Sequence, residues 1–522
     1  MFSPDLACTS YSAVDSIYVC AFIYAAAQNE VSNAKQLTLA GLLDSIERAR
    51  APSAEQAATM LYNFGKALKK EGLGGMRPRR ISDAAGKLIR LLAGDGSVQH
   101  AGQFSQLDRK QLSLSAWALS QLKAYCEPNE AKRFGISLAA QMLSITAVVD
   151  WRSLSGVLYG LAKSGISCES SKEVQQLFML AVSQRLPELL TNGDECSAQD
   201  ISNTLLACLE AGYVGDMQPL KSGIASPAGV SVLNADDAKA QAVSNVVWAL
   251  GRLRCYDAAV YGTASEALLL KFDKCNGQDV ANHFIACAEA CHWDGSMEEL
   301  AELVSMQSEQ QWSTWNGQVI SNSLNAWAVL SAAGPSAASA SFSFRSMAQV
   351  LFKQASKRGS LFYNDKELRQ LFAAHQVVMH NELGGGLSAN EKLLEHASVS
   401  HEASLSRTQG MLKYTNVTQQ VAKALERAGY GAKMAQVVEK DGVEEVAPLL
   451  ARGVAVYIMA ADAYFRCPSD LLSGSKRVHV VIAGWVCDGV VVLFEAEWAG
   501  LRGDPKQQEA FLAQRMQQAL KI

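Results

Sequence analysis

The chain has 522 residues, of which 49% are hydrophobic and 19% are charged, a composition that excludes a disordered chain and indicates several folded modules. The formal net charge of −4 argues against a uniformly basic nucleic-acid-binding protein, although basic residues can still gather on one surface. The longest apolar run, 478–494, contains Asp488 and is too short to cross a bilayer, so we expect no membrane partner.

The first expected element is a helical segment over residues 1–49. Asp5 and Asp15 precede the first basic residue, Lys35. This end therefore resembles neither a secretory signal nor an Arg-rich organellar presequence. Two interpretations stay open, namely that the protein is not imported through such a leader or that the gene model lacks its first exon.

From there on, a short phrase recurs about every forty residues. Each clear copy opens an apolar stretch that ends in a tail similar to Trp248-Ala249-Leu250. The clear copies contain the pairs Gln199/Asn203, Gln241/Asn245, Gln278/Asn282 and Gln318/Asn322. Weaker copies begin at Glu55, Lys110, Arg152 and Lys366, which gives about eight units over residues 50–385. A period of this length is typical of a stacked repeat array.

Each unit is expected to contain two helices. Near Asn245 the apolar residues Val243, Val247 and Leu250 recur at helical spacing, which predicts one buried face. Second amphipathic runs are Ala258–Phe272, Met297–Met306 and Ser346–Ala355, while Val214–Asn234 predicts a short or interrupted helix. The predicted fold class is therefore mainly α, with an α-solenoid of helix pairs. We expect the tail residues to be buried between units, namely Trp117, Tyr159, Leu206 and Trp248.

After about residue 386 the pattern changes. Glycines and a polar stretch predict a linker over 386–415. A helix over Val417–Ala428, a terminal helix over Gln507–Leu520 and three β-type runs between them predict a small α/β domain over 416–522. The β-type runs are 453–459, 477–482 and 489–494.

The C-terminal order of elements resembles the RAP domain, and the phrase Ser-Asn-x-x-Trp-Ala-Leu resembles octotricopeptide repeats. The FAST-kinase-like proteins of animals share this two-part layout. The resemblance implies a restriction-endonuclease-like C-terminal domain in an RNA-binding protein of a mitochondrion or chloroplast. It implies a role in RNA processing, stability, translation or rRNA assembly, with single-stranded organellar mRNA or rRNA as partner, and a ribosome or ribonucleoprotein granule as a further one. Two alternatives stay open, a non-catalytic structural RNA scaffold or ribosome-associated protein, and an RNA endonuclease that uses the RAP domain.

The chemistry of the RAP-like stretch departs from the family. The family's central strand usually runs into Glu-x-Asp-Gly-Pro-x-His-Phe, and here Tyr457, Met459 and Ala463 replace its two acidic residues and its His. Metal-dependent phosphodiester cleavage needs clustered carboxylates, of which only Glu444 or Glu445 could remain. We therefore expect no catalytic residue and no enzymatic activity.

In each clear copy Gln and Asn lie four residues apart and share a helical face. Amide side chains can donate to and accept from the edge of a base, and some helical arrays read one base per repeat. For the Asn, a structural alternative is hydrogen bonding to backbone between stacked units. The residues predicted to bind RNA at the slot that begins each phrase are Gln199, Gln241, Gln278, Gln318, Lys110, Arg152 and Lys366.

Basic residues cluster over Lys66–Arg90, and a second cluster runs from Arg345 to Arg369. The alternative to a phosphate-binding surface is a pair of solvated helix faces. Within the first cluster we expect Lys69, Lys70, Arg79 and Arg80 to bind RNA.

No metal site or cofactor is expected. Cys287 and Cys291 lie one turn apart beside His292, but no second ligand pair follows them. His375 and His380 do not have a one-turn spacing, and the scattered cysteines suit a reducing compartment.

Overall fold

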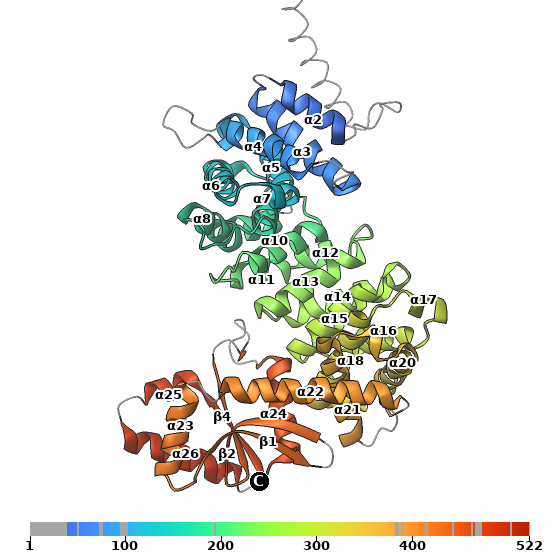
Figure 1. Ribbon diagram of the computed structural model, residues 1–522, viewed down its shortest axis with the longest axis vertical. Coiled ribbons are helices and arrows are strands. Elements are labelled where there is room, and N and C mark those ends of the chain that lie inside the picture. Colours follow the sequence, from blue (N-terminus) through green and yellow to red (C-terminus); the bar gives the residue numbers. More distant parts are fainter. Residues whose placement is uncertain are drawn as a thin grey trace, which may run out of the picture. The chain divides into compact units, whose positions relative to one another are not determined.

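The computed structural model describes residues 39–49, 52–72, 77–93, 103–192, 195–381, 386–388, 390–412, 416–440, 443–460, 463–464, 472–501 and 504–520. Over these residues the protein is mainly helical, with one small mixed sheet near its C-terminal end (Figure 1). Of the helical segment expected over 1–49, residues 1–38 lie outside the described part, and α2 (Leu39–Arg48) follows them. The chain divides into two compact units, Met1–Val232 and Leu233–Ile522, so the boundary falls inside the range 50–385.

In the first unit, each repeat phrase begins a helix, and these first helices pack side by side in chain order. They are α3 (Ala54–Glu71), α5 (Arg109–Leu122), α7 (Trp151–Lys163) and α10 (Ala198–Glu210). A second row of helices packs in the same order. It contains α4 (Pro78–Ala93), α6 (Pro128–Ile145), α8 (Lys172–Leu180), α9 (Leu186–Thr191) and α11 (Gln218–Ile224).

The second unit continues the same pattern. Its first helices, again packed in chain order, are α13 (Ala240–Leu253), α15 (Gly277–Ala290), α18 (Gly317–Ala333) and α21 (Asp365–His380). The second row contains α14 (Ala258–Leu270), α16 (Gly295–Ser305) and α20 (Phe342–Arg358), which confirms the three second helices expected from the sequence. The short helices of this unit are α17 (Glu309–Ser313) and α19 (Ser336–Ala340), and the short helix α12 (Pro227–Asn234) crosses the boundary between the two units. As expected, Val214–Asn234 holds only short helices.

Capping residues fix where the first helices begin. At α10, the Ser197 hydroxyl accepts the backbone N–H of Asp200 at 3.3 Å, and the Asp200 carboxylate accepts the N–H of Ser197 at 3.1 Å. Asn276 and Asp279 make the same reciprocal pair at α15. These contacts satisfy amides that a helix start leaves without a partner, so every capped copy begins its helix at the same place in the phrase.

Small residues let the first helices approach closely. A Cβ placed on Gly160 of α7 would lie 2.5 Å from the carbonyl carbon of Ala116 on α5. A Cβ on Gly65 of α3 would lie 3.3 Å from the Cα of Ala118 on the other side of α5. The backbones of α3, α5 and α7 therefore nearly touch, which holds their outward stripes side by side.

The C-terminal part of the second unit is a mixed four-stranded sheet with helices on both faces. Its strands are β1 (Lys433–Lys440), β2 (Val443–Ala451), β3 (Val454–Met459) and β4 (Gly489–Phe494). They lie in the order β1-β2-β3-β4, with β3 and β4 parallel and the other pairs antiparallel. The helices are α23 (Asn416–Arg427), α24 (Gly474–Val486), α25 (Glu495–Gly500) and α26 (Pro505–Ala519). One face packs on α23, α25 and α26 around Trp498, and the other packs on α24.

Two expectations for this part were wrong. The run 477–482, expected as a strand, lies in the helix α24, because Val478, Ile482 and Val486 recur every four residues and pack together. Most of the expected linker, 386–415, is the helix α22 (Glu391–Leu412), which packs against α21 and buries Leu393 and Ala397 one turn apart. Strands β1 and β2 had no counterpart among the expected β-type runs.

We predict that Gly160→Ala destabilises the first unit. Alanine is favoured over glycine in a helix by about 1 kcal/mol, but here its methyl group meets the backbone of α5, and overpacking costs about 1–3 kcal/mol. Urea unfolding should therefore show a lower midpoint. Gly295→Ala is the matched control, because open space surrounds Gly295 on α16 and its unfolding midpoint should not fall. An unchanged midpoint for Gly160→Ala would contradict the close approach.

Candidate nucleic-acid interface

The residues predicted at the Gln slot lie on the outward side of the first helices. Residues that follow the slot by four and seven positions lie on the same stripe, because seven residues make about two helical turns. On α13, for example, Gln241 is exposed while Asn245 and Trp248 are half-buried. The exposed members of the predicted set are Gln199, Gln241, Gln318, Lys110, Arg152 and Lys366, and Gln278 is half-buried.

The Asn residues connect neighbouring first helices. The Asn282 side chain on α15 donates to the Asn245 side chain on α13 at 3.4 Å. Gln278 donates to the same Asn282 at 2.6 Å. Between α21 and α18, Gln370 donates to Asn322 at 3.1 Å. These amide groups hold the second unit's helices together, as in the structural alternative for the Asn, but they bond side chain to side chain and not to backbone.

The tail residues are not buried as expected. Trp117, Tyr159, Leu206 and Trp248 are half-buried, since they follow the slot by seven positions and lie on its stripe. The fully buried side chains of the repeat lie elsewhere, for example Trp151 and Trp327. The seven-residue spacing was the sequence signal that could have placed the tail aromatics on the outer stripe.

The four predicted basic residues have different environments. Three of them are exposed, namely Lys69, Lys70 and Arg79. Arg80 instead binds the carboxylates of Glu47, at 2.6 Å, and Asp44, and these hydrogen bonds raise its pKa. Arg80 therefore ties α4 to α2, and its positive charge is already matched.

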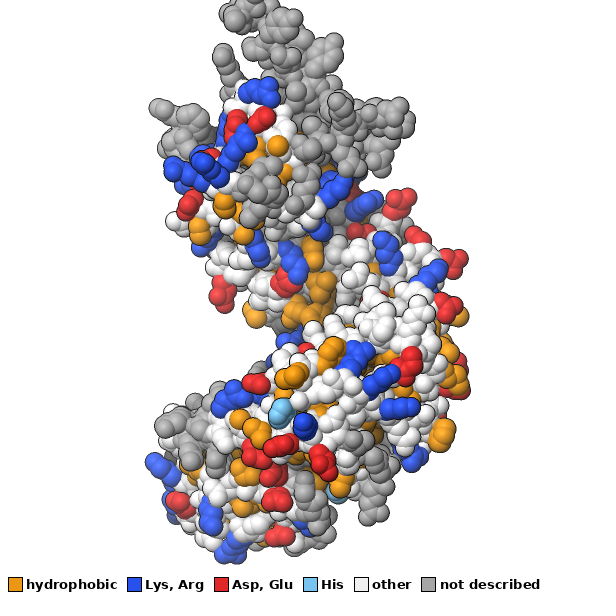
Figure 2. Space-filling view, turned by 45° about the vertical axis from the view of Figure 1, so that its right-hand side comes forward, with side chains coloured by type: hydrophobic (Ala, Val, Ile, Leu, Met, Phe, Trp, Pro, Cys, Tyr) orange, Lys and Arg blue, Asp and Glu red, His pale blue; other side chains and the backbone are white. Residues whose placement is uncertain are grey.

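Nearby cations of the same cluster are also engaged. Lys87 donates to the carbonyl oxygens of Ile46 and Ala49, at 2.8 and 2.6 Å, at the C-terminal end of α2. Arg90 pairs with Glu130 at 2.7 Å. On the face drawn in Figure 2, Lys and Arg side chains gather over the N-terminal helices, and Asp and Glu side chains lie among them there as on the rest of this face. The cationic surface of the cluster is therefore smaller than its residue count indicates.

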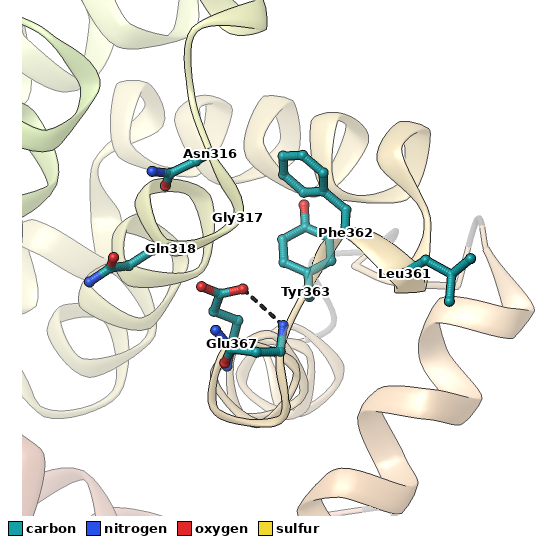
Figure 3. Close-up of a pocket in the computed structure, with 8 residues that line it drawn as sticks. Asn316, Gly317, Gln318, Leu361, Phe362, Tyr363 and Glu367 are labelled. Atoms are coloured by element: carbon teal, nitrogen blue, oxygen red, sulfur yellow. Dashed lines mark hydrogen bonds between the residues drawn. The ribbon is translucent and has the colours of Figure 1, made fainter. Parts of the chain in front are cut away.

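A pocket of about 480 Å³ opens at the start of two neighbouring first helices, α18 and α21 (Figure 3). Gln318 and Asn316 line one side of it, and Phe362 and Tyr363 line another. Glu367 lies between them and accepts the N–H of Asn364 at 3.0 Å. The pocket therefore places a predicted slot residue next to aromatic rings, a combination that suits a planar polar ligand.

The C-terminal part covers the far end of the same stripe in the second unit. The N–H of Ser475, in the first turn of α24, donates to the Glu289 carboxylate on α15 at 3.2 Å. Gly474 lies against the carbonyl oxygen of Ala288, and the Trp485 ring stacks on His380 of α21 at 3.8 Å. The slot ends of α15 and α18 stay uncovered by this contact, while Lys476 and Arg477 are exposed beside it.

The residues that stand where the RAP pattern has its acidic positions lie in a small apolar core. Tyr457 and Met459 both point to the α24 face of the sheet, and Ala463 packs with them. Glu445 is buried and pairs with His479 of α24 at 2.9 Å, while Glu444 lies opposite another carboxylate, that of Glu439, in the register of β1 and β2. Two carboxylates with these separate neighbours do not converge on one point.

The cysteine and histidine residues considered as ligands have other partners. The Cys287 thiol lies 3.6 Å from Nε2 of His283, and burial raises the pKa of the thiol and lowers that of His283 to about 3. His292 lies between Tyr256 and Asp294, and His375 accepts the N–H of Leu387. Among the described residues, no group of three or more His, Cys, Asp or Glu is arranged to hold a metal ion.

Comparisons with known proteins add no relative to this picture. No family model matches the sequence, and no curated protein matches it. Within the described ranges, no helix combines the length and the hydropathy needed to cross a bilayer.

The Glu445–His479 pair predicts a pH-dependent stability. The Glu445 carboxylate raises the pKa of His479 above 6.5, while burial and Lys476 oppose it. The pair's stabilisation is therefore complete below pH 6.5 and is lost as the pH rises through the folded pKa. Because the His479 side chain is 53% exposed, we expect about 1 kcal/mol or less.

The measurement is the melting temperature of wild type and His479→Gln at several pH values. The variant should melt lower than wild type in mild acid, and the difference should shrink in mild alkali. His396→Gln, an exposed position on α22, controls for the loss of one histidine. A difference between wild type and His479→Gln that does not change with pH would exclude a charged pair.

Proposed function

We propose that the helix pairs of each unit form an α-solenoid that binds single-stranded RNA along its first helices. The observation that carries the proposal is one exposed polar or basic side chain at the same slot of successive helices, as at Lys110, Arg152 and Gln199. Such a row matches the repeat of a nucleic-acid strand, which presents one base and one phosphate per nucleotide.

The role that fits this binding is post-transcriptional RNA metabolism in a mitochondrion or chloroplast, as the resemblance to octotricopeptide-repeat and RAP proteins implies. The C-terminal sheet would then be a RAP-like module. We propose that it is non-catalytic and contacts RNA or protein, because Tyr457 and Met459 pack in its core and Glu445 is paired with His479. The ribosome-associated scaffold is the second candidate, favoured by the amides of Asn245 and Asn282, which bond to each other and not outward.

We predict that replacing Gln199, Gln241 and Gln318 by Ala weakens binding of single-stranded RNA by about tenfold for each lost base contact. The melting temperature should stay near that of wild type, because the three side chains are exposed and the one hydrogen bond among them, from Gln199 to Asn203, lies on the exposed surface of a single helix. Gln278→Ala is the contrasting variant, since it removes the hydrogen bond to Asn282 and should lower stability. Filter binding and thermal melting measure the two effects.

The bound RNA should also be recovered at full length after incubation with magnesium or manganese. Cleavage that disappears in a Glu444→Gln, Glu445→Gln double variant would restore the endonuclease alternative. Wild-type affinity in the triple Gln variant would instead remove the slot from the RNA-binding surface and favour the scaffold without sequence choice.

Neighbouring arginines provide a matched test of the basic cluster. Arg79→Ala should weaken binding to every RNA sequence and reduce the slope of log affinity against log salt by about 1, because one phosphate contact is lost. Arg80→Ala should leave the salt slope unchanged and lower the melting temperature slightly, because it removes the partly exposed cation that ties Asp44 and Glu47 of α2 to α4. Titrations at several salt concentrations separate the two variants. Equal salt slopes for both would show that the cluster is not a phosphate-binding surface.

A further inference from the structure

The first unit carries a row of aromatic side chains at the position seven residues after the slot. Tyr62 on α3, Trp117 on α5 and Tyr159 on α7 are all half-buried, and these helices are direct neighbours. The ring centroids of Tyr62 and Trp117 are 5.2 Å apart and tilted by 55°. Since the two rings already touch, a planar ligand can stack on their exposed faces but cannot enter between them.

Cations accompany these rings. The Lys69 ammonium lies 5.8 Å from the centre of the Trp117 ring, and the Lys163 ammonium lies 5.4 Å from that of Tyr159. Lys110 and Arg152 lie two turns before Trp117 and Tyr159 on the same stripes. The acidic residues on these stripes are Glu55 and Glu210, and Glu210 pairs with Lys163. The stripe is therefore basic, although the whole chain has a net charge of −4.

The equivalent positions of the second unit differ. They hold Trp248, Ile285, Asn325 and Ala373, so only the first of its four helices presents a ring there. The amides of Asn245 and Asn282 lie on the same stripes. Aromatic faces thus dominate the outer stripe of the first unit, and amide groups dominate that of the second.

We propose that Tyr62, Trp117 and Tyr159 form a stacking track for the unpaired bases of a nucleic-acid strand, with Lys69, Lys110 and Arg152 beside its phosphates. The proposal rests on the RNA-binding function proposed above. It assigns to the first unit a mode of binding that does not depend on the base sequence of the RNA, since every base has a π face. A duplex cannot use this track, because its bases are stacked on each other and hide their faces.

The test uses the full chain and three probes of equal length, an unstructured single-stranded RNA, the same backbone without bases, and a perfect RNA duplex. The variant is Tyr62→Leu, Trp117→Leu, Tyr159→Leu, which removes the aromatic rings but keeps apolar side chains and all charges. We expect wild type to prefer the single strand over both other probes. The triple variant should lose about tenfold in affinity per base contact for the single strand and little for the abasic strand. With single-stranded DNA of the same sequence as a fourth probe, the triple variant should show the same loss.

Trp117→Phe keeps an aromatic face and should bind more tightly than Trp117→Leu, which separates stacking from a loss of folding. If the triple variant unfolds, two comparisons still test stacking. They are Trp117→Phe against Trp117→Leu, and the affinity of wild type for the normal strand against the abasic strand. Binding that is equal for the abasic and the normal strand, with Trp117→Leu equal to Trp117→Phe, would overturn the stacking track but leave RNA binding intact. A wild type that binds none of the probes would overturn the proposed function itself and point to a protein ligand for this face.

Discussion

The close backbone contact between successive first helices is the constraint on which the outer surface depends. Gly160 against Ala116 and Gly65 against Ala118 bring three helices together in the first unit. In the second unit, Gly251 of α13 faces Ala286 of α15. A Cβ placed on Gly251 would lie 3.6 Å from the Cα of Ala286. Because helices packed so closely share a register, side chains at equal places in the phrase come to lie next to each other. The Tyr62–Trp117 ring contact and the Asn282–Asn245 hydrogen bond are both consequences.

The repeat phrase predicted the first helices well because capping and apolar spacing are local signals. Ser197 and Asn276, residue types that favour the position before a helix, cap two of these helices in the structure. The error over 477–482 has a different origin, since a run of six residues rich in Val fits a strand or a buried helix equally well. What decides is tertiary packing, where Ile482 and Val486 face the sheet.

In the candidate site, too, the sequence predicted features that depend on neighbouring residues better than features that depend on distant ones. Exposure of the slot residues follows from helical periodicity alone. Periodicity does not show whether a cation is free to bind a ligand or already paired. The partners of Arg80, for example, lie 36 and 33 positions earlier, at Asp44 and Glu47. The tail aromatics were assigned to the core because large apolar side chains usually lie there. Yet α5 contacts α3 and α7 on two sides and α6 behind, which leaves a fourth side open to solvent. Trp117 lies on that side.

The amide network makes the slot positions of the second unit unequal. For Gln278 to offer both hydrogens of its amide nitrogen to a base, it must give up its hydrogen bond to Asn282, which costs about 0.5–1.5 kcal/mol unless the base replaces it. Gln241 and Gln318 are exposed on helices to either side and need no such exchange. Asn282 in turn is bonded to Asn245, so a ligand that moves Gln278 also disturbs the contact between α15 and α13. Discrimination between bases would therefore be strongest at Gln241 and Gln318. At Gln278 it would be coupled to the packing of two helices, so that binding there and stability would change together.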